Sequence, residues 1–426
     1  MSDATTPGTV PEALAEPTVR VRAVFMIGLA LANLGIMLAF FTPILNLLPR
    51  LSEEIAGSDG KEAALAVVTG VGVIGSVIGN PLAGALSDRT TSRFGRRRPW
   101  MLGGSLLGLV GLFLMPHMTS VIALTALWLV VQFAVNAAYA GLTATIPDQV
   151  PVDQRGVASG LVGLAQAIGP VIGVGLVTYV VLSLNGGSYL TAFLFVLFVL
   201  PFMFILKDPP LPKDKQPPFD LGAFIKGFWV SPKAHPDFAW AWLARFLVSL
   251  GFAMSTLYLL FFLQDHLGFP AQEAGTRQTN LLLGYTLGII ITAVLGGYIS
   301  DRLGKRKVFV IVATIVMAIA GVILAFTPAN NAGYGLAMIA AVILGLGYGW
   351  YLSVDQALIT QVLPTAGDRA RDLGVINIAN SMPQVLAPVL CALFVTVLGG
   401  YTSLYLATAV ITLIGAIAVV PIKSVP

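Results

Sequence analysis

The sequence contains few of the residues that carry enzyme chemistry or covalent cross-links. Its single cysteine, Cys391, lies inside an apolar stretch, which excludes a disulfide framework and a cysteine-based metal site. The three histidines lie in separate segments, and no paired aspartates stand at metal-binding spacing. A GxxxxGK[ST] phosphate-binding loop is also missing, which removes nucleotide hydrolysis as an energy source. We therefore expect a protein that is not an enzyme and that holds no metal and no cofactor.

Charged residues are also scarce. Only 10% of the 426 residues are Asp, Glu, Lys or Arg, whereas 57% are hydrophobic, and the mean hydropathy is +0.87. A water-soluble domain does not have this balance, so the composition predicts a protein embedded in the lipid bilayer. The formal net charge of +4 is divided among short loops between apolar segments, which favours anchoring to the membrane surface and argues against nucleic acid as a partner.

Twelve apolar runs are bounded by Pro, Gly and charged residues. A helix needs about 20 apolar residues to cross a membrane, and most of the runs meet this length. The sequence therefore predicts an all-α membrane protein with twelve transmembrane helices, at residues 23–48, 63–87, 100–116, 120–147, 156–183, 188–206, 239–264, 279–300, 307–327, 334–363, 372–397 and 400–421.

The distribution of Lys and Arg predicts the orientation. With the N-terminus inside, every Lys and Arg except Arg50, Lys61 and Arg277 falls on the cytoplasmic side. We therefore expect a multi-pass protein of the plasma (inner) membrane with both termini cytoplasmic. The first 22 residues are polar and rich in Pro and Thr, which is typical of a cytoplasmic tail and not of a cleaved signal.

An internal repeat divides the chain. GALSDR at 84–89 returns as GYISDR at 297–302, and each copy is followed by Gly and basic residues. Pro151 and Pro364 have the same separation as the two copies, 213 positions, and each ends the fourth helix of its half. A polar stretch rich in Pro and Lys lies between the halves. The predicted divisions are a tail at 1–22, a six-helix bundle at 23–206, a linker at 207–238, a second six-helix bundle at 239–421 and a C-terminus at 422–426.

The Ser-Asp-Arg motifs after the second and eighth predicted helices, together with the six-plus-six layout, resemble the major facilitator superfamily. The long form SDRTTSRFGRRRP, with NPLAG before it and VDQALITQVLP in the tenth helix, is most similar to the glycoside and sucrose-type cation symporters. The resemblance implies two pseudo-symmetric six-helix bundles that rock about a site near the middle of the membrane.

The arginine-rich loop after the second helix has two interpretations. Arginines there anchor the helix end to anionic headgroups, at about 1 kcal/mol each. The resemblance implies a cytoplasmic gate instead, in which Asp88 faces span eleven and Arg96 or a neighbour pairs with Asp148, while Asp301 faces span five by symmetry. The repeated motif favours the gate. Its expected residues are Gly84, Asp88, Arg89, Arg96, Asp148, Arg155, Asp301 and Arg302.

Two ionisable residues are expected deep in the membrane. Asp355 lies about 13 Å from the cytoplasmic end of span ten, and Arg245 about 10 Å from the start of span seven, at 1.5 Å per residue. Because their depths match, we predict an ion pair that couples protonation to conformation: desolvation favours the protonated carboxyl, and a nearby guanidinium favours the ionised one. The alternative is that Asp355 only hydrogen-bonds Tyr348 or Tyr351 on its own helix face.

Amides and aromatic residues are frequent in the predicted spans. Neutral polyols need paired donors and acceptors beside a flat apolar surface, and such side chains supply both. The alternative is that the amides only join helices, at about 0.6 kcal/mol each, which is the interpretation preferred for Asn80 and Gln384. The expected substrate-binding residues are Asn33, Gln132, Asn136, Tyr139, Tyr258, Tyr348, Tyr351, Gln356, Asn377 and Asn380.

These features predict a monomeric secondary transporter that works by alternating access. The second and fourth helices lack the interior acids of sodium-coupled glycoside symporters, so the proton is the expected coupling ion. We expect uptake of a sugar or glycoside by symport. The alternative is proton-coupled efflux of an amphipathic compound or drug, because Gly156, Gly169, Pro170 and Gly173 partly match the fifth-helix pattern of drug exporters.

Overall fold

The computed structural model describes residues 17–216, 222, 232–303, 306–362 and 369–423. Within these ranges the side chains of some residues are not described: 152, 215, 294–303, 356, 357, 359–362, 369–378, 380 and 381.

The first half of the described chain is helical and has short connections. Its first helical segment passes through a π-helical turn, η2 (Pro43–Leu47), and its fifth ends in another, η4 (Leu176–Val180). The α-helices of this half are α1 (Ala23–Thr42), α2 (Leu48–Ala56), α3 (Lys61–Ser87), α4 (Arg98–Leu114), α5 (Val121–Gln149), α6 (Val152–Gly175) and α7 (Leu184–Ile205).

The second half follows the same plan. Its first helix is interrupted at Tyr258, continues as the short α10 and ends in the π-helical turn η6 (Phe262–His266). The α-helices of this half are α9 (Pro236–Leu257), α10 (Leu259–Phe261), α11 (Ala271–Leu303), α12 (Arg306–Ala325), α13 (Tyr334–Val362), α14 (Arg369–Thr396) and α15 (Gly400–Val419).

These elements form twelve long helical segments in the described part of the chain, which confirms the predicted all-α membrane fold. Ten of the segments are long and apolar enough to cross a membrane, and α11 and α14 are the other two. Most boundaries lie within about four residues of the prediction, and two differ by more. The first segment continues to Ala56 and the eighth begins at Ala271, because their added turns carry charged residues that the apolar pattern does not reveal, such as Glu53 and Arg277.

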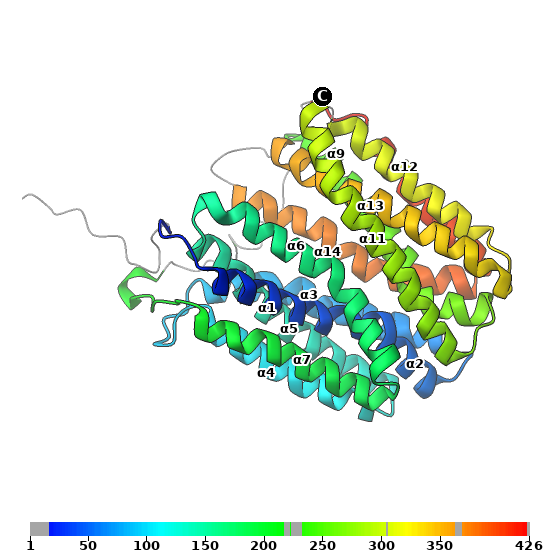
Figure 1. The fold of residues 1–426 in the computed structure, drawn as a ribbon, viewed down its shortest axis with the longest axis horizontal. Helices are drawn as coiled ribbons and strands as arrows, with labels where there is room; N and C mark the ends of the chain where they lie inside the picture. Colours follow the sequence, from blue (N-terminus) through cyan, green and yellow to red (C-terminus); the bar gives the residue numbers. More distant parts are fainter. Residues whose placement is uncertain (1–16, 217–221, 223–231, 304–305, 363–368, 424–426) are drawn as a thin grey trace, which may run out of the picture.

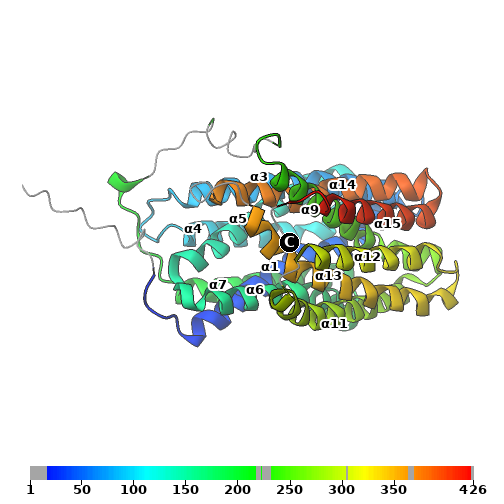
Figure 2. The ribbon, with the colours of Figure 1, turned by 90° about the horizontal axis from the view of Figure 1, so that it is seen from above.

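The two halves lie side by side and meet along two seams. Within the first half α1 packs on α6 and α7, and within the second α9 packs on α15. Between the halves α3 packs against α14, and α6 packs against α11. Figure 1 shows the early helices on one side and the late helices on the other, and Figure 2 shows the two seams on opposite sides of the molecule.

Glycines allow the closest helix contacts inside each half. A Cβ on Gly75 of α3 would lie 2.5 Å from the Leu129 carbonyl oxygen of α5. Glycines also bring α13 close to α11. A Cβ on Gly345 would overlap the Tyr285 carbonyl oxygen. A Cβ on Gly349 would lie 2.5 Å from the Ile289 carbonyl oxygen. Since apolar side chains gain little by leaving lipid, close backbone packing of this kind is a main source of helix association in a bilayer.

We expect Gly345→Ala to destabilise the protein by about 1–3 kcal/mol, because the added methyl group forces α13 away from α11. Gly335→Ala is the matched control in the same helix, since no atom of the described residues lies within 4 Å of the position of its Cβ. Thermal unfolding in detergent should show a lower midpoint for Gly345→Ala only. Equal midpoints for the two variants would contradict this account of the packing.

Candidate functional site

Arg245 and Asp355 lie together inside the second half. The Nε atom of Arg245 on α9 is 3.3 Å from a carboxylate oxygen of Asp355 on α13, and the two side chains are 5% and 6% exposed. Arg245 stands about 14 Å along α9 from Pro236 at 1.5 Å per residue, so the pair is well inside the bundle. Charges at this depth are costly unless each offsets the other. The side chains therefore form one electrostatic unit.

An aromatic cluster borders this ion pair; we call Phe252, Tyr285, Tyr348 and Tyr351 the aromatic slab. The rings of Phe252 and Tyr348 are stacked with centroids 4.0 Å apart, and Tyr285 lies 5.8 Å from Phe252. Tyr351 lies 6.2 Å from Tyr348 and next to the Asp355 carboxylate, one turn earlier on α13. The slab brings three helices of the second half into contact and gives the ion pair a flat, mostly apolar neighbour.

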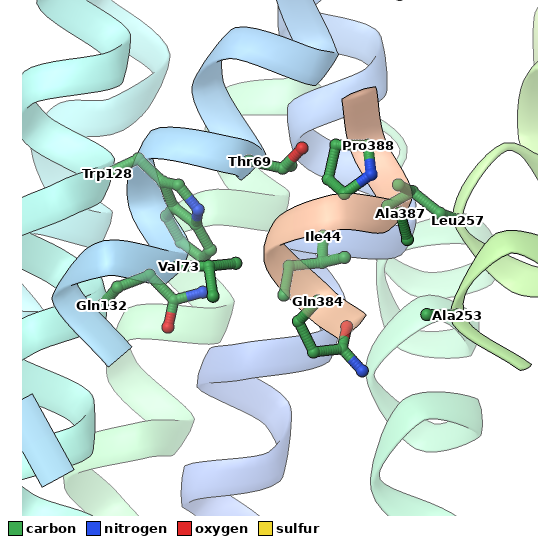
Figure 3. Close-up of a pocket in the computed structure, with 10 residues that line it drawn as sticks. All are labelled: Ile44, Thr69, Val73, Trp128, Gln132, Ala253, Leu257, Gln384, Ala387 and Pro388. Atoms are coloured by element: carbon green, nitrogen blue, oxygen red, sulfur yellow. The ribbon is translucent and has the colours of Figure 1, made fainter. Parts of the chain in front are cut away.

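A small cavity lies between the halves, at the seam of α3 and α14. It holds about 20 Å³, which is room for about one water molecule. Figure 3 shows Trp128 and Gln132 on one side and Gln384 with Pro388 on the other. The cavity is far smaller than the sites that bind small organic molecules, so it does not hold such a molecule in this conformation. Its lining residues are Ile44, Thr69, Val73, Trp128, Gln132, Ala253, Leu257, Gln384, Ala387 and Pro388.

Among the predicted binding amides, Gln132 reaches this cavity. Asn136, one turn further along α5, donates to the Gln132 carbonyl oxygen at 2.8 Å and lies 3.4 Å from its side-chain oxygen. Tyr139, on the same helix, accepts a hydrogen bond of 3.0 Å from Gln166 of α6. Asn33 is fully buried and donates to Leu29 on its own helix at 2.9 Å. Gln132 and Asn136 are therefore joined to each other, Tyr139 is joined to α6, and Asn33 is bonded within its own helix.

Other predicted binding residues lie elsewhere. The Tyr258 hydroxyl donates to the Glu62 carbonyl oxygen at 2.8 Å, at the end of the molecule opposite the arginine-rich loop. The side chains of Gln356, Asn377 and Asn380 lie outside the described residues.

The arginine-rich loop forms a charge network within the first half. Arg97 contacts Asp88 at 2.6 Å and Asp148 at 2.8 Å, and Arg96 contacts Asp148 at 3.2 Å. Both arginine side chains are buried although they belong to a loop. Burial lowers the pKa of Arg97, but its hydrogen bonds and attraction to Asp148 and Asp88 outweigh this, and the pKa is raised from its usual value. The guanidinium therefore stays charged.

Asp208, at the start of the predicted linker, is a partner that the sequence pattern did not indicate. Its carboxylate accepts the backbone N–H groups of Arg97 and Arg98, at 2.7 and 2.9 Å, where α4 begins. A carboxylate at a helix N-terminus is stabilised by the N–H groups and the helix dipole. Gln216 of the linker donates to the Arg89 carbonyl oxygen at 2.9 Å. The linker is thus joined to the arginine-rich loop.

Of the remaining gate candidates, the structure describes the surroundings of Arg155 and Gly84. Arg155 donates to the Val150 and Pro147 carbonyl oxygens at the end of α5, at 3.0 and 3.4 Å. No described atom lies within 4 Å of the position of a Cβ on Gly84, so this glycine makes no close helix contact among the described residues. The side chains of Asp301 and Arg302 lie outside the described residues.

Trp128 is a cavity residue that sequence reasoning missed. It is fully buried, and its indole lies so close to Gly72 of α3 that a Cβ on that glycine would overlap it. The available signal was its spacing, because Trp128, Gln132 and Asn136 stand four residues apart on one face of α5.

Comparison with known proteins gives a family and several distant relatives. The model of the Major Facilitator Superfamily matches residues 23–280 and 242–426. A general α-glucoside permease of Schizosaccharomyces pombe is 36% identical over 119 residues, which are 24% of this chain and 21% of the permease. An uncharacterized symporter of Synechocystis is 50% identical over 62 residues, 14% of this chain and 11% of that one. An aspyridones efflux protein of Neocamarosporium betae is 31% identical over 132 residues, 30% of this chain and 23% of that one.

Solved structures resemble the whole fold. A nucleoside transporter has a TM-score of 0.72 at 15% identity and covers 93% of this chain and 99% of its own. A D-xylose–proton symporter has a TM-score of 0.70 at 15% identity, and the match covers 95% of this chain and 98% of the symporter. At these identities the likeness shows the fold alone, and the matched segments of the sequence relatives span about a quarter or less of their length.

We expect Arg97→Ala to lower the stability of the protein by about 2 kcal/mol, because it leaves Asp88 and part of Asp148 without their charged donor. Arg93→Ala removes the same charge from an exposed position of the same loop and is the matched control. Thermal unfolding of the two purified variants separates network formation from simple anchoring. If both unfold at the same temperature, the network contributes nothing to stability.

Proposed function

The chain belongs to the Major Facilitator Superfamily, and on this basis we propose that it is a proton-coupled carrier that takes up a sugar or glycoside. Membership makes it a multi-pass membrane protein and a secondary transporter of a small molecule, not an enzyme. The coupling ion, the substrate class, the direction of transport and the inner-membrane location are parts of the proposal.

The observation that carries the proposal is the buried ion pair of Arg245 and Asp355. A carboxylate paired with a guanidinium in a dry bundle changes its proton affinity when either water or the partner moves. Helix motion between α9 and α13 would therefore bind or release a proton at Asp355. At a membrane potential of 100 mV each charge moved supplies about 2.3 kcal/mol, enough to drive modest accumulation of a neutral solute.

The sugar or glycoside is supported by the chemistry around the cavity. Gln132 and Gln384 provide amide donors and acceptors from the two halves, and Trp128 provides a flat ring. Neutral groups of this kind suit hydroxyl-rich, uncharged ligands. The names of the α-glucoside permease and the D-xylose–proton symporter agree with this class, within the limits of their short or distant matches.

Efflux of an amphipathic compound is the second candidate. Gly169 and Gly173 of α6 lie against Met37 and Thr42 of α1, so this stretch is closely packed as in the exporter-like pattern. Pro170 lies between them inside the helix. The sequence similarity to the aspyridones efflux protein also favours efflux.

Asp355→Asn should abolish uphill, pH-driven accumulation of a radiolabelled sugar in proteoliposomes, because the proton-binding oxygen is lost. Exchange of labelled for unlabelled sugar down its gradient should continue. The sugar panel would contain a monosaccharide, a disaccharide and an aryl glycoside, with a lipophilic cation as the efflux probe.

Glu273→Gln is the matched control, since that carboxylate forms an exposed pair with Arg277 of its own helix at 3.0 Å. It should leave accumulation unchanged. If Asp355→Asn carried out uphill transport at the rate of the unmodified protein, Asp355 would not be the proton-binding residue. Transport of the lipophilic cation with no transport of any sugar would favour efflux.

A further inference from the structure

A third buried charge cluster lies at the end of the molecule opposite the arginine-rich loop. The Lys61 ammonium, at the first residue of α3, is 2.6 Å from Asp265 and 3.6 Å from Glu53. The Tyr401 hydroxyl donates to the other oxygen of Asp265 at 2.9 Å. Only 4% of the Lys61 side chain is exposed. This is the burial expected of a packed interior group and not of a surface lysine.

The cluster joins the two halves of the chain. Lys61 belongs to the first half, while Asp265 and Tyr401 belong to the second. The Lys61 ammonium also lies 4.9 Å from the centre of the Phe261 ring, a cation–π contact across the same boundary. The hydrogen bond from Tyr258 to the Glu62 carbonyl oxygen crosses it beside them. The ion pairs of Arg96 and Arg97, by contrast, stay within the first half.

Neighbouring hydrogen bonds join α11 to the π-helical turns η2 and η4. The Gln278 amide donates to the Leu45 carbonyl oxygen at 2.7 Å, and the Tyr179 hydroxyl donates to Asn280 at 3.0 Å. Both bonds join one half to the other. The halves are therefore closed against each other at this end by an ion pair and hydrogen bonds that cross the boundary.

The helix ends that meet here carry unusual geometry. The π-helical turns η2, η4 and η6 all lie toward this end of the molecule, and Asp265 is part of η6. π-Helical turns are rare and cluster at functional sites, because they depart from the regular hydrogen-bond pattern. The segment that holds Asp265 also follows the break at Tyr258, which separates it from the straight part of α9.

We propose that Lys61, Asp265 and Tyr401 form a latch that holds this end of the transporter closed, and that each transport cycle breaks it. A buried ammonium is stable only while its carboxylate partner is present, so closure satisfies both charges and opening returns both to water. Removing one partner shifts the equilibrium towards the open form. The latch is independent of which substrate is carried and of which ion drives it.

The test measures access from the Lys61 side with a single cysteine. Cys391→Ser removes the one native thiol, and Thr69→Cys places a reporter on the cavity wall about 12 Å deeper along α3 than Lys61. Ser58→Cys, an exposed position at the Lys61 end, identifies the vesicles in which this end faces the added reagent. A membrane-impermeant maleimide is then added to vesicles of that orientation. We expect Lys61→Met and Asp265→Asn to increase the Thr69→Cys labelling rate at least about tenfold.

Tyr401→Phe removes one hydrogen bond while keeping the ring, and should increase the rate by about threefold. Arg277→Met removes a cation at the same end whose partner lies in its own helix, and should leave the rate unchanged. Unchanged labelling in Lys61→Met and Asp265→Asn would overturn the latch. If those variants do not fold, unchanged labelling in Tyr401→Phe overturns it instead. No substrate or proton gradient is used, so failure of the sugar proposal leaves this result intact.

Discussion

The need to pair every charge taken into a bilayer-spanning bundle governs this structure. An isolated charge inside the membrane is costly, so it persists only beside a partner or at water. Three buried charge clusters meet this requirement at different depths: Arg245 with Asp355 in the interior, Arg96 and Arg97 with Asp148 at the basic end, and Lys61 with Asp265 at the other. Where each partner lies in the chain determines which motions the pair allows.

Pairs inside one half and pairs between halves have different consequences. The Arg97 network and the glycine contacts of α3 with α5 and α11 with α13 lie within a half, so they persist when the halves move. The pair of Lys61 and Asp265 and the bond from Gln278 to Leu45 exist only while one end is closed. The small cavity between the halves is in keeping with a closed state, since its volume admits about one water molecule.

Much of the fold was predictable because its signal is local. Long apolar runs fix the helices, and regular rise along α9 and α13 was enough to bring Arg245 to the depth of Asp355. The contacts that the sequence did not predict involve residues outside the regular α-helices or at a break in one. Asp208 follows the last helix of the first half, Asp265 lies in a π-helical turn, and Tyr258 stands at a helix break, so periodicity gives no information on where their side chains point.

The central claim is that substrate binding changes the protonation of Asp355. Infrared difference spectroscopy of the reconstituted protein measures this directly, through the C=O stretch of a protonated carboxylic acid. Addition of a transported sugar should change a band in this region, and the change should be missing in Asp355→Asn. A substrate-induced spectrum with no carboxylic acid band, or the same band in Asp355→Asn, would contradict the account.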